Sequence, residues 1–104
     1  MDLEIRFDEA MMNIYVRALD EANYNATRYH EMLIRHRGLA TARILLNAPA
    51  VSEGYTALWM RHRLDLTVEA LIFDNQEFHP LFDEHELTLV RVRLQDFGYP
   101  PASE

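Results

Sequence analysis

Apolar residues recur every three or four positions through most of this chain, a spacing that places them on one face of an α-helix. The first such stripe runs from Met11 to Ala22. It follows Asp8, a residue type that caps the N-termini of helices. Apolar and polar residues alternate from Leu3 to Phe7, as in a strand. Because a lone strand would have no partner, we expect a short extended arm there.

The segment from residue 23 to residue 49 predicts two more helices. Asn23-Tyr24-Asn25 interrupts the first stripe, and Asn25 can cap a second helix. Gly38 can end that helix, and residues 39–46 then form a short third one. Asn47-Ala48-Pro49 closes the third helix, because proline cannot continue one.

Residues 52–74 predict a fourth and a fifth helix. Ser52 is a good N-cap for the fourth, which carries apolar and aromatic residues on one side. After a corner at residues 61–63, either Asp65 or Thr67 can start the fifth.

The clearest helix signals lie near the end of the chain. Asp83, followed three positions later by Glu86, has the spacing of a capping box, which predicts a helix that begins at Glu84. Gly98 can adopt the left-handed conformation that closes a helix. Residues 90–94 also alternate like a strand, but the start signal, the stop signal and the length together favour a helix.

These elements predict an all-α fold: a single compact bundle of five or six short helices with an extended N-terminal arm. One domain spans residues 1–104, with an ordered core at about 8–99 and loose ends at 1–5 and 101–104. The residues expected to form the centre of the core are Ile14, Leu33, Leu58, Trp59, Leu71, Leu94 and Phe97.

Composition narrows the class of protein. The chain has no cysteine, so it can contain neither a disulfide nor a zinc–thiolate site, and we expect a cytoplasmic protein. The longest apolar runs are far too short to cross a bilayer, and the acidic N-terminus does not resemble a signal peptide.

Charge is distributed unevenly. Residues 1–25 carry a net charge of −4, residues 26–63 carry +4 and residues 64–104 carry −7. A chain this acidic repels nucleic acid at long range, but an arginine face could still bind a phosphate backbone. The alternatives are a basic middle that packs between acidic ends, and acidic ends that mimic nucleic acid towards a basic partner protein. The candidate basic patch consists of Arg28, Arg35, Arg37, Arg43, Arg61 and Arg63.

No combination of residues predicts a reaction. The histidines lack the spacing of three or four that a two-histidine metal site on a helix requires. Arg61, Asp65 and Glu69 are spaced by four, which predicts an ion-pair ladder or, as the alternative, a polar site. No serine lies in a nucleophile elbow, and the three glycines are too scattered for a phosphate loop. We therefore assign no catalytic, metal or cofactor residue.

Five blocks spread over nearly the whole chain carry a resemblance: YNATRY (24–29), GLATARILL (38–46), SEGYTALW (52–59), RLDLTVEAL (63–71) and FGY (97–99). With these blocks the chain resembles a family of small bacterial proteins of unknown function. The resemblance implies a helical domain and no catalytic residue. The chain departs from the pattern at two corners, with His62 where a glycine is expected and Gly38-Leu39 where a second glycine is usual.

Two classes of function remain from the sequence. We favour a non-enzymatic module that binds another protein or a second copy of itself through aromatic and methionine side chains, with Tyr24, Tyr55 and Met60 as candidates. The same residues could instead be ordinary core. The alternative function is a nucleic-acid-associated domain that uses the candidate basic patch.

Overall fold

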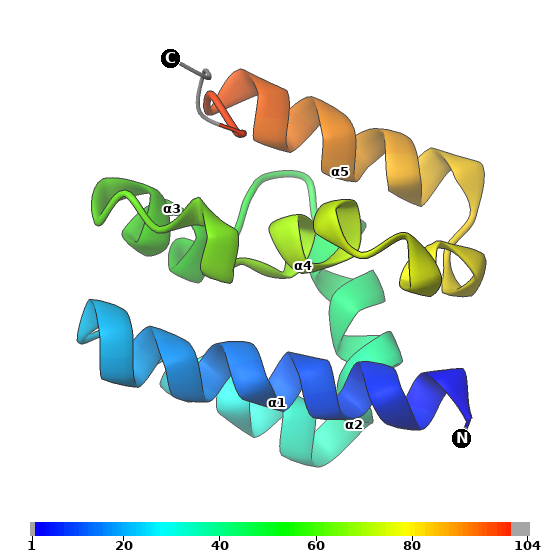
Figure 1. Ribbon diagram of the computed structural model, residues 1–104, viewed down its shortest axis with the longest axis horizontal. Coiled ribbons are helices and arrows are strands. Elements are labelled where there is room, and N and C mark those ends of the chain that lie inside the picture. Colours follow the sequence, from blue (N-terminus) through cyan, green and yellow to red (C-terminus); the bar gives the residue numbers. More distant parts are fainter. Residues whose placement is uncertain (1, 101–104) are drawn as a thin grey trace.

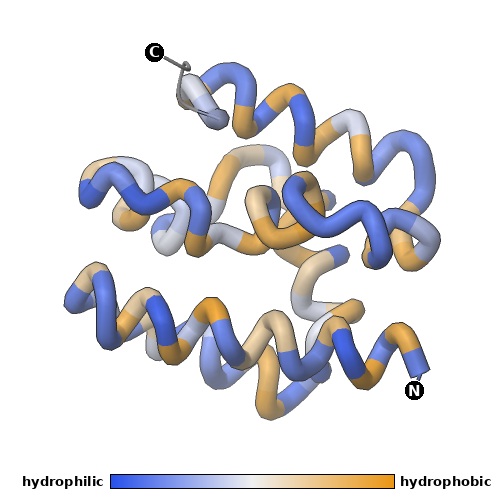
Figure 2. The backbone as a smooth tube through the Cα atoms, viewed as in Figure 1, coloured by the Kyte–Doolittle hydropathy of each residue, from blue (hydrophilic) through white to orange (hydrophobic). Residues whose placement is uncertain are grey.

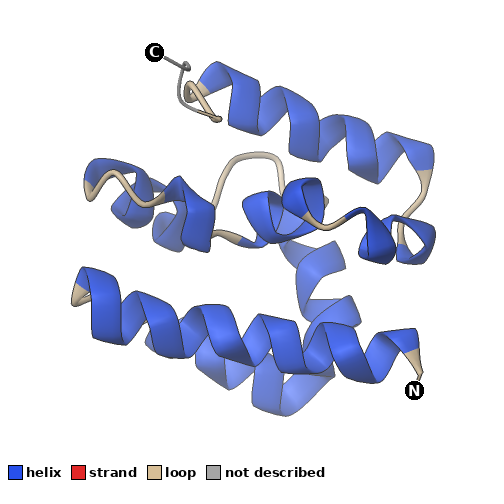
Figure 3. Cartoon of the chain, in the orientation of Figure 1, coloured by secondary structure: helices blue, strands red, loops and turns tan. Residues whose placement is uncertain are grey.

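The computed structural model describes residues 2–100, and within that range the chain consists of helices and loops without a strand (Figure 3). The expected all-α bundle is confirmed. The expected loose residues Met1 and 101–104 lie outside the described residues. The elements in chain order are α1 (Leu3–Ala22), α2 (Thr27–Leu46), α3 (Glu53–Met60), η1 (Leu64–Leu66), α4 (Val68–Asp74), η2 (Gln76–Leu81) and α5 (Glu84–Asp96), where η marks a 3₁₀-helix.

The helices are stacked in three levels (Figure 1). The first part of α2 lies alongside α1 in one level, and its second part rises behind α1 towards the middle level. Helices α3 and α4 form the middle level, and α5 covers it on the side away from α1. Hydrophobic and hydrophilic residues alternate along every helix at helical spacing (Figure 2). Each helix can therefore turn one apolar face towards its neighbours.

The expected extended arm is wrong, because residues 3–7 are the first turns of α1. Asp2 caps this helix, and its side chain accepts a hydrogen bond of 3.1 Å from the backbone N–H of Glu4. Phe7 is fully buried and continues the stripe of Met11 at helical spacing. Burial of Phe7 against the core therefore outweighs the local alternation, and the ordered part of the chain begins well before residue 8.

Asp8 does not start a helix; it lies inside α1 and its side chain accepts hydrogen bonds from α2. Helix α2 bends at Arg37, whose φ of 68° and ψ of −179° free the backbone N–H of Gly38. The Asp8 carboxylate accepts that N–H at 2.7 Å and the Nε–H of Arg37 at 3.0 Å. A Cβ on residue 38 would lie 2.7 Å from Asp8 Oδ1, so glycine permits this close approach. The expected break near Gly38 is therefore a bend inside α2.

Three of the expected N-caps are confirmed, and two, Asp8 and Asn25, are wrong. Ser52 accepts a hydrogen bond from Tyr55 N, and Thr67 starts the fifth predicted helix rather than Asp65. Asp83 and Glu86 form a complete capping box at α5. Asn25 is not a cap: Ala26 precedes α2 without a side-chain hydrogen bond.

The core differs from the expected one mainly at Trp59. Ile14, Leu33, Leu58 and Leu94 are buried, and Leu71 and Phe97 pack against them while partly exposed. Trp59 is 44% exposed, so its assignment to the core is wrong. The physical reason is that α3 is only two turns long and its buried face is taken by Tyr55 and Leu58, which leaves Trp59 at the edge against Phe97. The fully or nearly fully buried side chains of greatest volume are Tyr55, Phe7, Met11, Leu46, Leu66, Ile72 and Leu94.

Three non-glycine residues of the described chain have a positive φ, which glycine adopts more easily: Asn23 at the end of α1 has a φ of 51°, and the other two lie at corners. His62 has a φ of 60° in the turn after α3, and Arg37 has a φ of 68°. His62 is the position where the sequence pattern leads us to expect glycine.

Candidate functional site

A cleft of about 580 Å³ is lined by residues of α1, the loop between α1 and α2, α2, α3, η1 and the start of α4. Its size lies within the range of small-ligand and side-chain pockets. All sides of the cleft contribute apolar or aromatic side chains to its lining. These include Ile14, Tyr24, Tyr29, Tyr55, Leu58 and Leu66. A second hollow of about 880 Å³ lies between α1, α4 and η2, but charged and polar side chains, such as Arg6, Glu9 and Arg17, form most of its lining.

Two of the three candidate interaction residues line this cleft. Tyr24 lies in the loop between α1 and α2, partly buried, with the guanidinium of Arg61 4.9 Å from its ring centre. Tyr55 is only 2% exposed and its hydroxyl donates to the carbonyl oxygen of Arg93 at 2.9 Å. It therefore supports the base of the cleft and cannot form an outer contact surface. Met60 is 69% exposed and lies outside the cleft.

The polar groups at the base of the cleft already have partners inside the protein. The Tyr29 hydroxyl donates to the carbonyl oxygen of Met11 at 2.8 Å, and Thr67 Oγ1 donates to the carbonyl oxygen of Leu64 at 2.7 Å. Burial raises the pKa of the Tyr29 hydroxyl well above its usual value. This hydroxyl therefore stays protonated near neutral pH and acts as a fixed donor.

A buried ion pair lies behind the same wall. Glu69 Oε2 accepts a hydrogen bond of 3.2 Å from Arg93 Nη1. Burial raises the pKa of the Glu69 carboxyl, while Arg93 acts in the opposite direction. Arg93 also donates to the carbonyl oxygens of Leu45 at 3.0 Å and Ala48 at 2.8 Å, which satisfies the end of α2. The pair thus joins α2, α4 and α5.

Sequence reasoning missed this pair, because its members are 24 positions apart and belong to different helices. One signal was present. Glu69 is the only charged residue between Leu66 and Phe73, and a carboxylate inside an apolar run implies a buried partner.

The expected ladder of Arg61, Asp65 and Glu69 is wrong. Arg61 donates to the carbonyl oxygens of Ala22 and Ala57, whereas Asp65 pairs with Arg63 at 2.9 Å. The ladder requires one continuous helix. The chain instead turns between residues 61 and 67, where a 3₁₀-helix separates α3 from α4. The alternative polar site does not form either, since the three side chains have separate partners.

The candidate basic patch is neutralised at most of its positions. Four of its members have carboxylate partners: Arg28 with Glu53, Arg37 with Asp8, Arg43 with Glu86, and Arg63 with Glu21 and Asp65. Arg61 binds backbone carbonyls, and Arg35 lines the cleft. This pairing matches the expectation in which the basic middle packs between acidic ends.

Two of the five histidines make contacts within the fold, and His36, His62 and His85 are exposed. His30 stacks on Tyr15 with ring centres 4.3 Å apart, and His79 Nε2 lies 2.8 Å from the carbonyl oxygen of Ile72. Across residues 2–100, no three histidine or carboxylate side chains converge as metal ligands would.

Comparison of the chain with protein-family models, with curated proteins and with solved structures gave no match. The resemblance to small bacterial proteins of unknown function therefore stays a prediction. Among the described helices, none combines the length and the apolar character needed to cross a membrane.

Proposed function

We propose that this chain is a cytoplasmic, non-enzymatic protein-interaction module whose cleft receives an apolar side chain of a partner protein. One observation carries the proposal: the cleft of about 580 Å³ has aromatic and aliphatic walls, while the polar groups at its base are engaged within the fold. What remains for a ligand is mainly apolar surface. Apolar pockets of this kind receive the buried anchor residues that dominate binding energy in protein interfaces.

The rim of the cleft agrees with a protein partner. Arg28 and Arg35 stand there beside Glu31 and Glu53, so both signs of charge surround the apolar centre. Protein interfaces have this arrangement of a dry centre and a polar rim. A nucleic-acid site would present uncompensated positive charge, but Arg28 already lies 3.9 Å from Glu53.

Gly54 offers a way to fill the cleft without disturbing the fold. It lies in the first turn of α3, and a Cβ there would be 3.6 Å from Tyr24 Oη and 3.8 Å from Ser52 Oγ, which is ordinary contact. The leucine side chain of Gly54→Leu should therefore fill part of the cleft. Gly54→Ala is the control, because it also raises the helix propensity of this position but adds little volume.

A peptide-display selection on the wild-type protein, followed by titration of the selected peptides against both variants, tests the proposal. We expect peptides with an apolar or aromatic anchor that bind wild type and Gly54→Ala but lose at least about tenfold in affinity with Gly54→Leu. Selected peptides that bind Gly54→Leu equally well would remove the cleft from the interaction. Salt-sensitive binding of nucleic acid, lost when Arg35, Arg37 and Arg43 are changed together, would favour the alternative function.

A further inference from the structure

One polar side chain in the lining of the cleft has capacity for a further hydrogen bond. Glu69 lines the cleft and is only 3% exposed. Within the described residues, its carboxylate accepts a hydrogen bond from Arg93, and its own backbone N–H also acts on it. A carboxylate has about four lone-pair sites, so these two donors leave part of its acceptor capacity unused.

The unused capacity lies mainly at Oε1 of Glu69. Arg93 binds the other oxygen, Oε2, at 3.2 Å, and no other residue among 2–100 donates to Oε1. Oε1 is not sealed from solvent, because Thr41 Oγ1 is the only fully buried side-chain oxygen or nitrogen without a partner in the described part of the chain. Of the two hollows described above, only the cleft has Glu69 in its lining. A group that enters the cleft can therefore reach Oε1.

The other polar groups at the base of the cleft have no donor to offer. The hydroxyls of Tyr29 and Tyr55 each donate to a backbone carbonyl oxygen. Thr67 Oγ1 donates to one backbone group and accepts from another. The protons of all three hydroxyls are thus committed within the fold. A polar group of a ligand that reaches the base must itself donate, and Glu69 is the acceptor that awaits it.

The charge of the buried pair determines which kind of donor fits. The Glu69 carboxylate is already neutralised by the Arg93 guanidinium, so a lysine ammonium in the cleft would leave one buried positive charge without a counter-charge. A neutral O–H or N–H adds no charge. It still forms a hydrogen bond to an ionised acceptor, which is stronger than one between neutral groups.

The depth of Glu69 and the apolar walls of the cleft select among the neutral donors. The donor must lie far from the backbone of the partner, with an apolar body between them. Tyrosine meets both conditions, because its O–H lies at the far end of its ring. The indole N–H of tryptophan lies on the side of the ring system instead. The hydroxyls of serine and threonine stay close to their own backbone.

We propose that the anchor residue of the partner protein is a tyrosine, whose hydroxyl donates a hydrogen bond to Glu69 Oε1 while its ring packs against the walls of the cleft. This inference rests on the proposed function and names the side chain that the cleft receives. Tyrosine is also one of the residue types that contribute most to binding energy at protein interfaces.

Titration of the wild-type protein with two probes, N-acetyl-L-tyrosinamide and N-acetyl-L-phenylalaninamide, tests the inference without a mutation. The probes differ by one hydroxyl. Followed by NMR of the backbone amides, both should shift the signals of cleft residues, and the tyrosine probe should bind at least about tenfold more tightly, because only it supplies the donor. Equal affinities, or no binding of the tyrosine probe at millimolar concentration, would overturn the inference. Tighter binding of N-acetyl-L-lysinamide would overturn the choice of a neutral donor.

Glu69→Gln tests which acceptor the hydroxyl uses. The glutamine oxygen can still accept from Arg93, which turns the amide NH₂ towards the cleft, so the preference for the tyrosine probe should disappear. Glu31→Gln is the matched control: it removes the same charge from an exposed residue of the rim and should keep the preference. Binding of the phenylalanine probe reports that Glu69→Gln is folded. A preference retained in folded Glu69→Gln would assign the hydroxyl to another acceptor and overturn the inference.

The two proposals fail separately. The selected peptides and Gly54→Leu test the cleft as a binding site whatever its anchor. If the cleft binds peptides but the two aromatic probes bind equally well, the tyrosine is wrong and the apolar site remains.

Discussion

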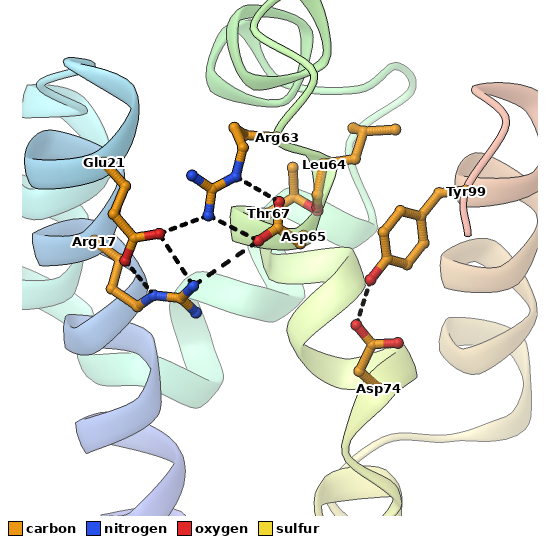
Figure 4. A network of polar contacts seen from close by, with 8 residues as sticks. All are labelled: Arg17, Glu21, Arg63, Leu64, Asp65, Thr67, Asp74 and Tyr99. Atoms are coloured by element: carbon orange, nitrogen blue, oxygen red, sulfur yellow. Dashed lines mark hydrogen bonds and ion pairs between the residues drawn. The ribbon is translucent and has the colours of Figure 1, made fainter. Parts of the chain in front are cut away.

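Two clusters of arginine and carboxylate in this molecule use the same chemistry in opposite surroundings. The Arg93–Glu69 pair lies between α4 and α5 with side chains only 11% and 5% exposed. The second cluster joins Arg17, Glu21, Arg63 and Asp65 at the surface between α1 and η1, where each side chain is between 28% and 41% exposed (Figure 4).

The two clusters shift the pKa of their glutamates in opposite directions. Burial raises the pKa of Glu69. Hydrogen bonds from Arg17 and then Arg63 lower the pKa of Glu21 to about 2. Water still solvates the surface cluster, so its charges gain partners without losing hydration. The buried pair has given up hydration and depends on one specific partner.

The number of ion pairs in a cluster is a poor guide to how much that cluster stabilises the fold. The surface cluster contains more ion pairs, yet each can be replaced by water. The buried pair is single, but Arg93 also satisfies two carbonyl oxygens at the end of α2, and its own carbonyl receives the Tyr55 hydroxyl. Arg93 therefore links four helices at one point.

The largest expected effect comes from breaking the buried pair. Glu69→Leu keeps a similar side-chain volume but leaves the Arg93 guanidinium buried without a carboxylate. We expect a loss of about 3 to 5 kcal/mol in the free energy of unfolding. Chemical denaturation followed by circular dichroism measures it.

A double-mutant cycle with Arg93→Met separates the pair from the rest of the contacts of Arg93. The double variant should lose less than the sum of the two single losses, because neither charge is then left alone. It should stay below the wild type, since the carbonyl oxygens of Leu45 and Ala48 lose their donor. Strict additivity would show that the two charges do not stabilise each other.

Much of the fold could be predicted from local signals. Ser52, Thr67 and the Asp83–Glu86 box cap helices as expected, because capping depends on residues a few positions apart. Asp8 misled the prediction for the opposite reason. Its residue type suits a cap, but the N–H that it binds belongs to Gly38, 30 positions away.

The site was harder to predict because it depends on how the levels stack. Tyr24 and Tyr55 were candidates, and both line the cleft. Their different burial follows from the packing of α3 against α5, which no local pattern encodes. The apolar stripe expected from Met11 to Ala22 also contains Leu19, which is 40% exposed. Helical spacing alone cannot tell which of two apolar sides faces the core.

An intermediate effect is expected at the corner that carries Arg63 into the surface cluster. His62 has a φ of 60° there, which costs an L-residue about 1 to 2 kcal/mol, whereas glycine adopts it freely. Glycine also loses more conformational entropy on folding than histidine does, which costs about 0.5 to 1 kcal/mol of stability. His62→Gly should therefore stabilise the protein by up to about 1 kcal/mol, seen as a melting temperature a few degrees higher.

Arg91→Gly is the control for this corner, because Arg91 lies in the interior of α5 and is exposed. It should lower the melting temperature, since glycine weakens a helix interior. A fall with both variants would show that the His62 side chain itself holds the corner.

The smallest effect on stability, and the sharpest contrast with Glu69, is expected at Glu21. Its depressed pKa means that the carboxylate stabilises the fold above its ordinary pKa of 4.5, and that this contribution is lost as the pH falls towards 2. A carboxyl-carbon NMR titration should place the midpoint of Glu21 at about 2. Arg63→Gln should move the midpoint upwards by removing the second donor, with little change in melting temperature. Arg91→Gln is the control, because Arg91 is an exposed residue of α5 away from the cluster, and it should leave the midpoint of Glu21 unchanged. A wild-type midpoint at the ordinary value would show that Glu21 forms no lasting ion pairs in solution. The Arg93–Glu69 pair would then be the only one of the two clusters that stabilises the fold.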